Sequence, residues 1–122
     1  FDGNREVKEF SAINKTEMIL DIGPKTIESI EAIIDKSNTV LWNGPAGYFE
    51  NENFSLGTTA IAKKISDNTA EKSLISIVGG GDTISAINNG NNQFSFTHLS
   101  TAGGAFLEFL EGKDLPGLNV LK

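Results

Sequence analysis

Short apolar runs alternate along this chain with segments of helical spacing, and few folds are compatible with that alternation. Four apolar runs have the length of buried strands: 18–23, 38–44, 73–81 and 96–100. A glycine-containing turn and a segment with helical spacing follow each run: 26–36, 58–68, 82–90 and the stretch around 106–110. Strands this apolar are typical of a sheet covered on both faces, so the alternation predicts an α/β fold, a parallel sheet with flanking helices.

Length, charge and cysteine content exclude several classes of protein. The 122 residues are enough for one hydrophobic core, so residues 1–122 are treated as one domain or as part of one. The first residues show no beginning of a core element, and we expect the chain to begin partway through a larger protein. The net charge is −6 and the Lys and Arg residues are scattered, so no nucleic-acid partner is expected. The chain has no cysteine and no apolar stretch long enough for a membrane span, which is compatible with a cytoplasmic protein.

Three glycines at 79–81 precede Asp82 where a predicted strand passes into a predicted helix. Backbone N–H groups are unpaired at a helix start, and a ligand can approach closely where side chains are absent, so this turn suits an anion. A carboxylate repels a phosphate unless a cation lies between them, and Mg²⁺ prefers carboxylate plus phosphate oxygens. Asp82 is therefore a candidate ligand for the Mg²⁺ of a nucleotide, with the hydroxyl or the amide of Thr83 on a phosphate. The alternative is that Asp82 is an N-cap and the glycines form a tight turn.

Two other predicted strand-to-helix turns carry unusual residues. Gly103 and Gly104 form a second glycine-rich helix start, and two such starts at successive strand ends would bring their amides to the same volume. The turn after the second run offers an amide, a rigid proline, a glycine, an aromatic ring and a carboxylate: Asn43, Pro45, Gly47, Tyr48 and Glu50. A carboxylate in a loop can accept hydrogen bonds from a ribose, and apolar surface can flank a base. For Tyr48 alone, packing at the core or its rim is favoured over contact with a base.

The remaining conspicuous side chains have structural interpretations. His98, the one histidine, lacks the spacing of a catalytic or metal-ligating set and is interpreted as structural or interfacial. Trp42 and Met18 are predicted to lie in the core.

Four segments, in their order and spacing, resemble the carboxyl-terminal part of the phosphoglycerate kinases: LDIGPKT, LWNGPAGYFE, IVGGGDT and HLSTAGGAFLEFLEGKDLPG. The resemblance runs from about Met18 to the end. It implies an enzyme of two Rossmann-like domains, of which the amino-terminal one binds 3-phosphoglycerate and the carboxyl-terminal one binds Mg-ATP or Mg-ADP. Residues 1–122 would be the later half of the nucleotide-binding domain, and the substrate domain would lie outside the chain. The implied enzyme is a cytoplasmic monomer of glycolysis that transfers a phosphoryl group reversibly between ATP and 3-phosphoglycerate, with 1,3-bisphosphoglycerate and ADP as the other pair.

The resemblance also implies roles for residues on the phosphate side of the site. Asp82 would help to coordinate Mg²⁺. Gly80, Gly81 and Thr83 would line the nucleotide phosphates, and Asn43 would lie near them.

Other residues would contact the nucleoside, the reacting group or the hinge. Glu50 would bind the ribose hydroxyls, and the nucleoside would be bordered by Pro45, Gly47 and Tyr48. The amides of Gly103 and Gly104 would face the transferring phosphoryl group in the transition state. The segment near the interdomain hinge would contain His98, Ser100 and Thr101, and the stretch after Gly112 would reach back to the other domain.

The chain departs from the family pattern at three positions. Ala102 and Phe106 stand where the family usually has a glycine and a serine. The methyl of Ala102 either narrows the approach of the phosphate or is harmless because the backbone there does not need a positive φ. Tyr48 stands where an aliphatic residue is common, so the nucleoside pocket is either reshaped or merely flanked.

The basic residues that the family uses lie outside this chain, so we expect the isolated chain to have no kinase activity. Two other interpretations stay open: a non-catalytic nucleotide-binding α/β module, and a purely structural use of the glycines.

Overall fold

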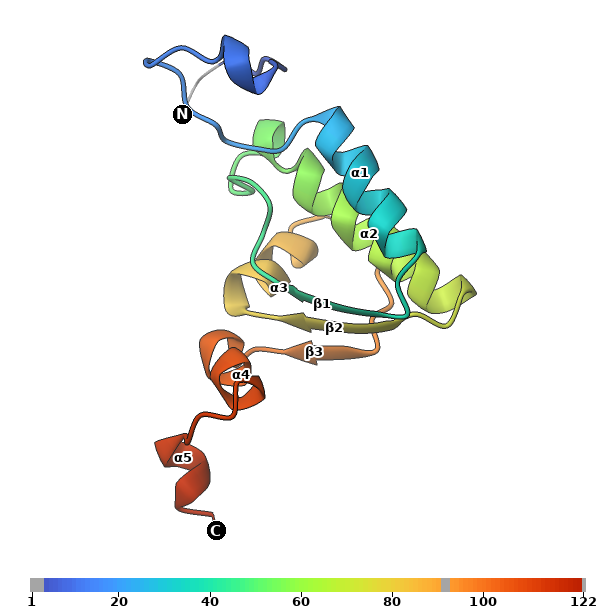
Figure 1. The fold of residues 1–122 in the computed structure, drawn as a ribbon, viewed down its shortest axis with the longest axis vertical. Helices are drawn as coiled ribbons and strands as arrows, with labels where there is room; N and C mark the ends of the chain where they lie inside the picture. The colour runs from blue at the N-terminus through green and yellow to red at the C-terminus, as the bar shows by residue number, and fades with distance from the viewer. Residues whose placement is uncertain (1–3, 91–92, 122) are drawn as a thin grey trace.

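A computed structural model describes residues 4–90 and 93–121, which form a three-stranded parallel sheet with helices packed on it (Figure 1). The elements follow one another in this order: η1 (Phe10–Ala12), α1 (Pro24–Asp35), β1 (Thr39–Asn43), η2 (Glu52–Phe54), α2 (Leu56–Glu71), β2 (Ile75–Gly79), α3 (Gly81–Asn88), β3 (His98–Ser100), α4 (Gly103–Leu110) and α5 (Pro116–Asn119). The η elements are 3-10 helices. The strand order is β1-β2-β3, and both neighbouring pairs are parallel. The α/β class predicted from the alternation is confirmed.

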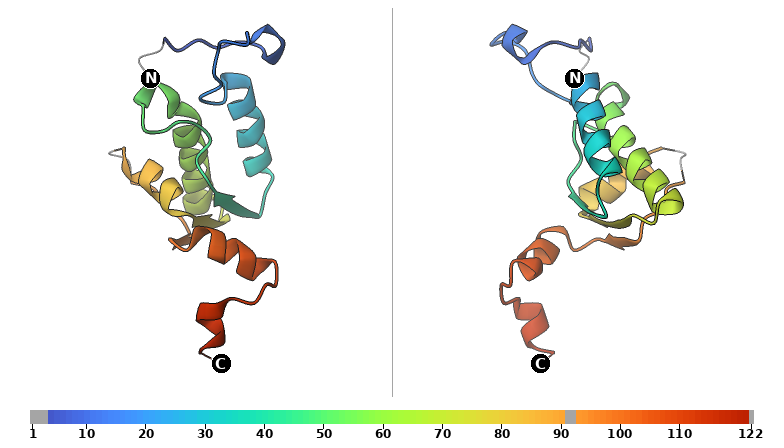
Figure 2. Two further views of the ribbon diagram at one scale, coloured as in Figure 1. Left: turned by 90° about the vertical axis from the view of Figure 1, so that its left-hand side faces the viewer. Right: turned by 45° about the vertical axis from the view of Figure 1, so that its right-hand side comes forward.

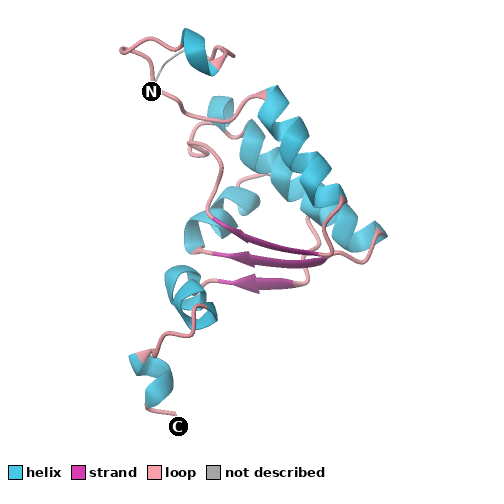
Figure 3. Ribbon diagram, in the orientation of Figure 1, coloured by secondary structure: helices cyan, strands magenta, loops and turns pink. Residues whose placement is uncertain are grey.

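The sheet is wound by two crossover helices. Helix α2 connects β1 to β2, and α3 opens the connection from β2 to β3, so all three strands point the same way (Figure 3). A parallel sheet requires such long connections because its strands cannot be joined by tight hairpins. As a result the carboxyl ends of the strands, with Asn43, Gly79 and Ser100, meet at one edge.

The core lies between one face of the sheet and helices α1, α2 and α3. Alternate residues of β1 and β2 enter it, and Val78 is completely buried there. The buried apolar cluster comprises Ile34, Trp42, Ile61, Ala62, Ile65, Leu74, Val78 and Ile87. The prediction of Trp42 as a core residue is confirmed. On the opposite face Leu41 and Ile75 remain 44% and 50% exposed.

An ionic and amide contact joins the ends of α1 and α2. The carboxylate of Asp35 accepts a hydrogen bond from Nδ2 of Asn68 at 2.9 Å and pairs with Lys64 at 3.0 Å and Lys72 at 3.4 Å. The hydrogen bond from Asn68, followed by the Lys64 contact, lowers the pKa of Asp35 to about 2. The backbone carbonyl of Asn68 also accepts the N–H of Leu74 just before β2, so this buried residue of α2 contacts both the end of α1 and the start of β2.

The first apolar run, 18–23, does not form a strand, and this part of the prediction is wrong. Met18 is 63% exposed and Ile19 is 65% exposed, so Met18 is not a core residue either. The polar groups of this segment bind loop and helix backbone instead of a strand ladder: the carbonyl of Leu20 accepts the N–H of Tyr48, and the carboxylate of Asp21 accepts the N–H of Gly57. A segment held in this way does not also pair with the sheet.

The last strand is shorter than the predicted run 96–100, for a local reason. Thr97 and Ser76 exchange side-chain hydrogen bonds: the N–H of Ser76 donates to Oγ1 of Thr97, and the N–H of Thr97 donates to Oγ of Ser76, both at 3.0 Å. The regular ladder between β2 and β3 therefore begins only at the pair Ile77 and His98.

Helices α4 and α5 extend away from the sheet (Figure 2). Phe109 and Leu110 of α4 are each more than half exposed, and Leu118 of α5 is 41% exposed. None of the helices within residues 4–90 and 93–121 combines the length and the apolar character needed to cross a bilayer.

Candidate functional site

The two glycine-rich turns meet at the carboxyl edge of the sheet, as the sequence predicts. The N–H of Gly80 donates to the carbonyl of Ser100 at 3.0 Å, and a Cβ placed on Gly103 would lie 3.3 Å from Cα of Gly80. Both glycines have positive φ, +96° at Gly80 and +45° at Gly103. The starts of α3 and α4 are therefore neighbours, and only glycine fits the backbone at these two positions without strain.

Gly81 and Gly104 follow these two glycines, and no described neighbour prevents a side chain at either position. A Cβ on Gly81 or on Gly104 would meet no described atom within 4 Å, and neither residue has a positive φ. Each is the first or second residue of its helix, where backbone N–H groups have no partner inside the helix. The two positions therefore combine unpaired amides with open space, which allows an anion to approach the backbone.

Asn43 ends β1 and lies directly against the first glycine turn. A Cβ on Gly80 would stand 2.7 Å from Oδ1 of Asn43, and one on Gly79 would stand 4.0 Å from its Nδ2. The structure therefore brings Asn43 together with Gly79 and Gly80, and Gly80 in turn contacts Gly103.

Thr83 is buried beneath the turn. Its side chain is 0% exposed, and its Oγ1 accepts the N–H of Gly44 at 2.7 Å. Nε1 of Trp42 donates to the carbonyl of the same Gly44, also at 2.7 Å. The Thr83 hydroxyl thus holds the residue after Asn43, so it links the start of α3 to the loop that follows β1.

Asp82 is the second residue of α3, and its side chain is exposed. The N-cap of α3 is Gly80, so the alternative that Asp82 is the N-cap is wrong. A carboxylate in the first helical turn is favoured by the helix dipole. Among the described residues no group of three or more His, Cys, Asp or Glu side chains could hold a metal ion. Asp82 can supply one carboxylate oxygen to a hard cation such as Mg²⁺, whose other ligands would come from a bound molecule and from water.

The loop after β1 is held in place by hydrogen bonds to two other segments. The N–H of Ala46 donates to Oγ1 of Thr58 at 2.9 Å, and the N–H of Tyr48 donates to the carbonyl of Leu20 at 2.8 Å. The ring of Tyr48 lies at the rim, since the residue is 38% exposed. Glu50 is exposed beyond it, and Pro45 and Gly47 are half-buried.

The departure at Ala102 is harmless to the backbone. Ala102 has φ −75° and ψ −12°, an ordinary helical conformation, so no positive φ is required there. The other departure, Phe106, places its ring 3.7 Å from where a Cβ on Gly79 would be, next to the end of β2. Of the segment expected near a hinge, His98 and Thr101 are exposed and Ser100 is half-buried.

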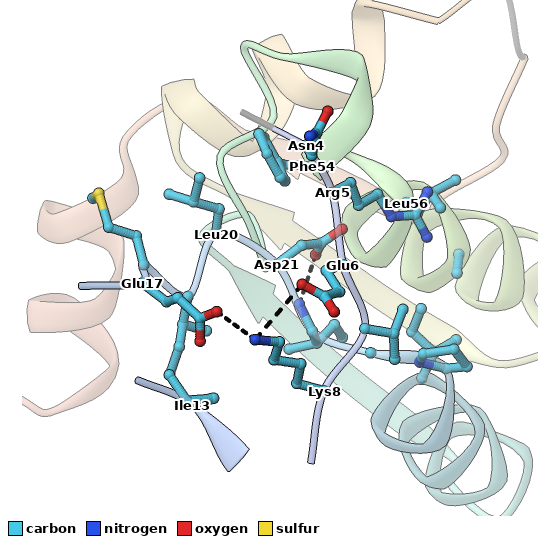
Figure 4. Close-up of a pocket in the computed structure, with 18 of the residues that line it drawn as sticks. Asn4, Arg5, Glu6, Lys8, Ile13, Glu17, Leu20, Asp21, Phe54 and Leu56 are labelled. Atoms are coloured by element: carbon cyan, nitrogen blue, oxygen red, sulfur yellow. Dashed lines mark hydrogen bonds and ion pairs between the residues drawn. The ribbon is translucent and has the colours of Figure 1, made fainter. Parts of the chain in front are cut away.

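Another hollow lies elsewhere, next to the amino-terminal segment. Its volume is about 800 Å³, and Figure 4 shows Lys8 between Glu6 and Glu17 on its wall, opposite Phe54 and Leu56. None of the predicted site residues lines it. It does contain Asp21, a residue that the sequence reasoning missed. The signal was available, because a carboxylate inside the otherwise apolar run 18–23 needs a partner.

A parallel sheet with crossover helices and adjacent glycine-rich helix starts at its carboxyl edge defines a protein of the Rossmann-like α/β class. The family model described as phosphoglycerate kinase matches residues 1–113. The chain belongs to the phosphoglycerate kinase family.

Individual relatives agree with this assignment. The chain is similar to the phosphoglycerate kinase of Agrobacterium fabrum, with 48% identity over 116 residues that cover 95% of this chain and 29% of that protein. It is 51% identical to that of Bradyrhizobium diazoefficiens over 111 residues, 91% of this chain and 28% of that protein. The solved structure of phosphoglycerate kinase from Coxiella burnetii superposes with a TM-score of 0.83 at 45% identity, covering 95% of this chain and 29% of that one. The chain thus spans less than a third of the length of the relatives that it matches.

Proposed function

We propose that this chain is the later half of a nucleotide-binding domain and that, with the rest of a phosphoglycerate kinase polypeptide, it transfers a phosphoryl group reversibly between ATP and 3-phosphoglycerate. In the glycolytic direction the substrates are 1,3-bisphosphoglycerate and ADP. The observation that supports this most directly is the pair of open glycines at 81 and 104. No contact within the described chain requires glycine at these two positions. Phosphate oxygens, by contrast, can approach the backbone amides closely only where no side chain is present.

In this proposal the chain contributes alignment and charge neutralisation. The acceptor is a carboxylate, which is ionised at neutral pH and needs no general base. Gly80, Gly81 and Thr83 line the nucleotide phosphates, and the amides of Gly81 and Thr83 bind them, since the N–H of Gly80 donates to the carbonyl of Ser100. Those of Gly103 and Gly104 face the transferring group, where they stabilise negative charge in the transition state.

Asp82 is the residue that holds Mg²⁺, which when bound to the nucleotide supplies positive charge to the phosphate oxygens. Asn43, against Gly80, directs its amide to the same oxygens. On the nucleoside side Glu50 accepts hydrogen bonds from the ribose, and Pro45, Gly47 and Tyr48 form the border.

Several features of the whole enzyme belong to the same proposal. 3-Phosphoglycerate binds to an amino-terminal domain, and the segment with His98, Ser100 and Thr101 lies near the hinge between the domains. The stretch after Gly112 reaches back to that domain. The complete enzyme is a cytoplasmic monomer, and the isolated 122-residue chain does not catalyse transfer because the basic residues of the site are supplied from outside it.

The experiment is a chimera in which this chain replaces the matching part of the Agrobacterium fabrum relative. Transfer from Mg-ATP to 3-phosphoglycerate is measured in a coupled assay, with Asp82→Ala and, as the matched control, Asp67→Ala. Asp67 is a partly exposed carboxylate of α2 that pairs with Lys63 at 2.8 Å. We expect Asp82→Ala to lower kcat/KM by about 100-fold or more with an unchanged unfolding midpoint, because the metal loses its protein ligand.

A non-catalytic nucleotide-binding module is the second candidate, and the same chimera separates the two. Such a module would bind nucleotide but give no turnover in the unsubstituted chimera. If the chimera turns over and Asp82→Ala retains wild-type activity, the assignment of the site is wrong.

A further inference from the structure

Asp21 joins two distant parts of the chain through both of its carboxylate oxygens. Oδ2 accepts the N–H of Gly57 at 3.0 Å, and Oδ1 accepts the N–H of Ile22 at 2.8 Å. Figure 4 shows this carboxylate next to the start of α2, near Phe54 and Leu56. Gly57 is the second residue of α2, whose N-cap Ser55 makes no side-chain cap hydrogen bond. The carboxylate therefore satisfies an amide, and places negative charge, at a helix start that lacks a cap of its own.

The same segment holds the loop that follows β1. The carbonyl of Leu20, the neighbour of Asp21, accepts the N–H of Tyr48 at 2.8 Å. From the other side, buried Thr58 in the first turn of α2 accepts the N–H of Ala46 at 2.9 Å. Residues 44–50 thus contact both segment 20–22 and the start of α2. Asp21 in turn binds segment 20–22 to the start of α2.

Gly47 lies directly on the Asp21 carboxylate. A Cβ at this position would stand 2.6 Å from Oδ1 of Asp21 and 2.6 Å from the backbone carbonyl of Phe54. Gly57 is equally close, since its Cβ would stand 2.4 Å from the same Oδ1. All three distances are far below van der Waals contact, so neither position has room for a side chain next to the carboxylate.

We propose that Asp21 is a positioning residue for the nucleoside side of the site: its carboxylate fixes residues 44–50, and with them Tyr48 and Glu50, relative to the phosphate-binding turns. A corollary is that Gly47 is glycine because of Asp21 and the Phe54 carbonyl and not because of the nucleoside. The inference rests on the proposed function for the role of the loop in binding a nucleoside, whereas the contacts of Asp21 with the loop and with α2 do not depend on that role.

The kinetic test uses the chimera with Asp21→Asn. In the asparagine side chain an NH₂ group replaces one of the two acceptor oxygens. This NH₂ group must face the N–H of Gly57 or of Ile22, so one of the two hydrogen bonds is lost. The glycine turns and Asp82 are attached to β2 and β3, so they stay in place. We expect KM for the nucleotide to rise about tenfold, the effect of a lost charged hydrogen bond, while kcat stays within about twofold. The control is Asp67→Asn, which removes a carboxylate farther along α2 and should change neither KM nor kcat.

A double-mutant cycle tests whether Asp21 acts through the loop. If it does, Glu50→Gln raises KM less in the Asp21→Asn background than in the wild type, because the ribose contact is already displaced. A fall in kcat with unchanged KM, or two effects that simply multiply, would overturn the proposal.

Amide hydrogen exchange on the 122-residue chain gives a readout that does not depend on activity. In Asp21→Asn we expect the amides of Gly57 and Tyr48 to exchange faster while that of Val78 in β2 is unchanged. Equal acceleration at Val78 means a loss of global stability and contradicts a positioning role, as does no change at all. Should the unsubstituted chimera show no transfer, the proposed function fails, yet the exchange result still decides whether Asp21 holds the loop.

Discussion

Gly80 and Gly81 are adjacent, yet substitution by alanine should affect them in opposite ways. At Gly80 an alanine has to adopt φ +96° and ψ 136°, and its Cβ stands 2.7 Å from Oδ1 of Asn43. A conformation so rare for a residue with a side chain costs of order 1–3 kcal/mol. We therefore expect the free energy of unfolding of Gly80→Ala to fall by about 2–3 kcal/mol, since displacement of the Asn43 amide adds to the backbone strain.

At Gly81 the added methyl meets no described atom within 4 Å and the residue is helical with ordinary φ. Alanine restricts the unfolded chain and favours the helix, so Gly81→Ala should be as stable as the wild type or more stable by about 0.4–1 kcal/mol. The methyl nevertheless occupies the space through which a phosphate reaches the amides. Displacement of the reacting group by about 1 Å costs on the order of 100-fold in kcat/KM, which is the loss that we expect in the chimera.

Urea unfolding of both variants and the coupled transfer assay measure these two quantities separately. Gly103 and Gly104 repeat the comparison in α4, with φ +45° and a contact at 3.3 Å at the first and open space at the second. If Gly81→Ala loses stability as Gly80→Ala does, the space next to Gly81 is not open. If Gly81→Ala is stable and fully active, no ligand requires the bare backbone at this position.

Four further substitutions test the fold. Asn68, followed by Lys64, lowers the pKa of Asp35 from 3.8 to about 2, so its contribution to stability is complete above about pH 5 and is lost as the pH falls through 4 toward 2. In Asp35→Asn the unfolding midpoint should therefore depend less on pH over that window. Ala102→Gly should lower the free energy of unfolding by less than about 1 kcal/mol and leave transfer in the chimera unchanged, because φ −75° suits alanine; a gain in activity would show that the methyl obstructs the phosphate. Val78→Ala removes two methyl groups from a completely buried site and should lower the free energy of unfolding, measured in urea, by about 2–3 kcal/mol. Ile75 is half exposed, so Ile75→Ala should lower it by less than about 1 kcal/mol. Equal losses would contradict a core on one face of the sheet.

The sequence predicted the elements that are strongly periodic and the turns that are rich in glycine. The predicted helices 26–36 and 58–68 correspond to α1 and α2, and the predicted runs 38–44 and 73–81 contain β1 and β2. These predictions were right because amphipathic spacing and Gly-Pro boundaries act locally, within a few residues. The convergence of the two glycine turns followed from topology, since parallel strands end at the same edge.

The run 18–23 misled because it has the composition of a strand. Whether an apolar segment joins a sheet depends on which backbone groups it finds as partners, and here those partners are the N–H groups of Tyr48 and Gly57. No periodicity within the run reports a partner that lies more than twenty residues away. The late start of β3 at His98 has the same origin, because Thr97 pairs with Ser76 through side chains.

The α/β class, the order of most helices and strands, and the residues at the carboxyl edge can be predicted without the coordinates, because they follow from local spacing and from the rule that parallel strands end together. Three features can be recognised only in the folded chain: which glycines the fold requires and which face open space, the hydrogen bond of the Thr83 hydroxyl to Gly44, and the contact of Asp21 with the start of α2. These are contacts between segments far apart in the chain, and their distances depend on how the whole core packs.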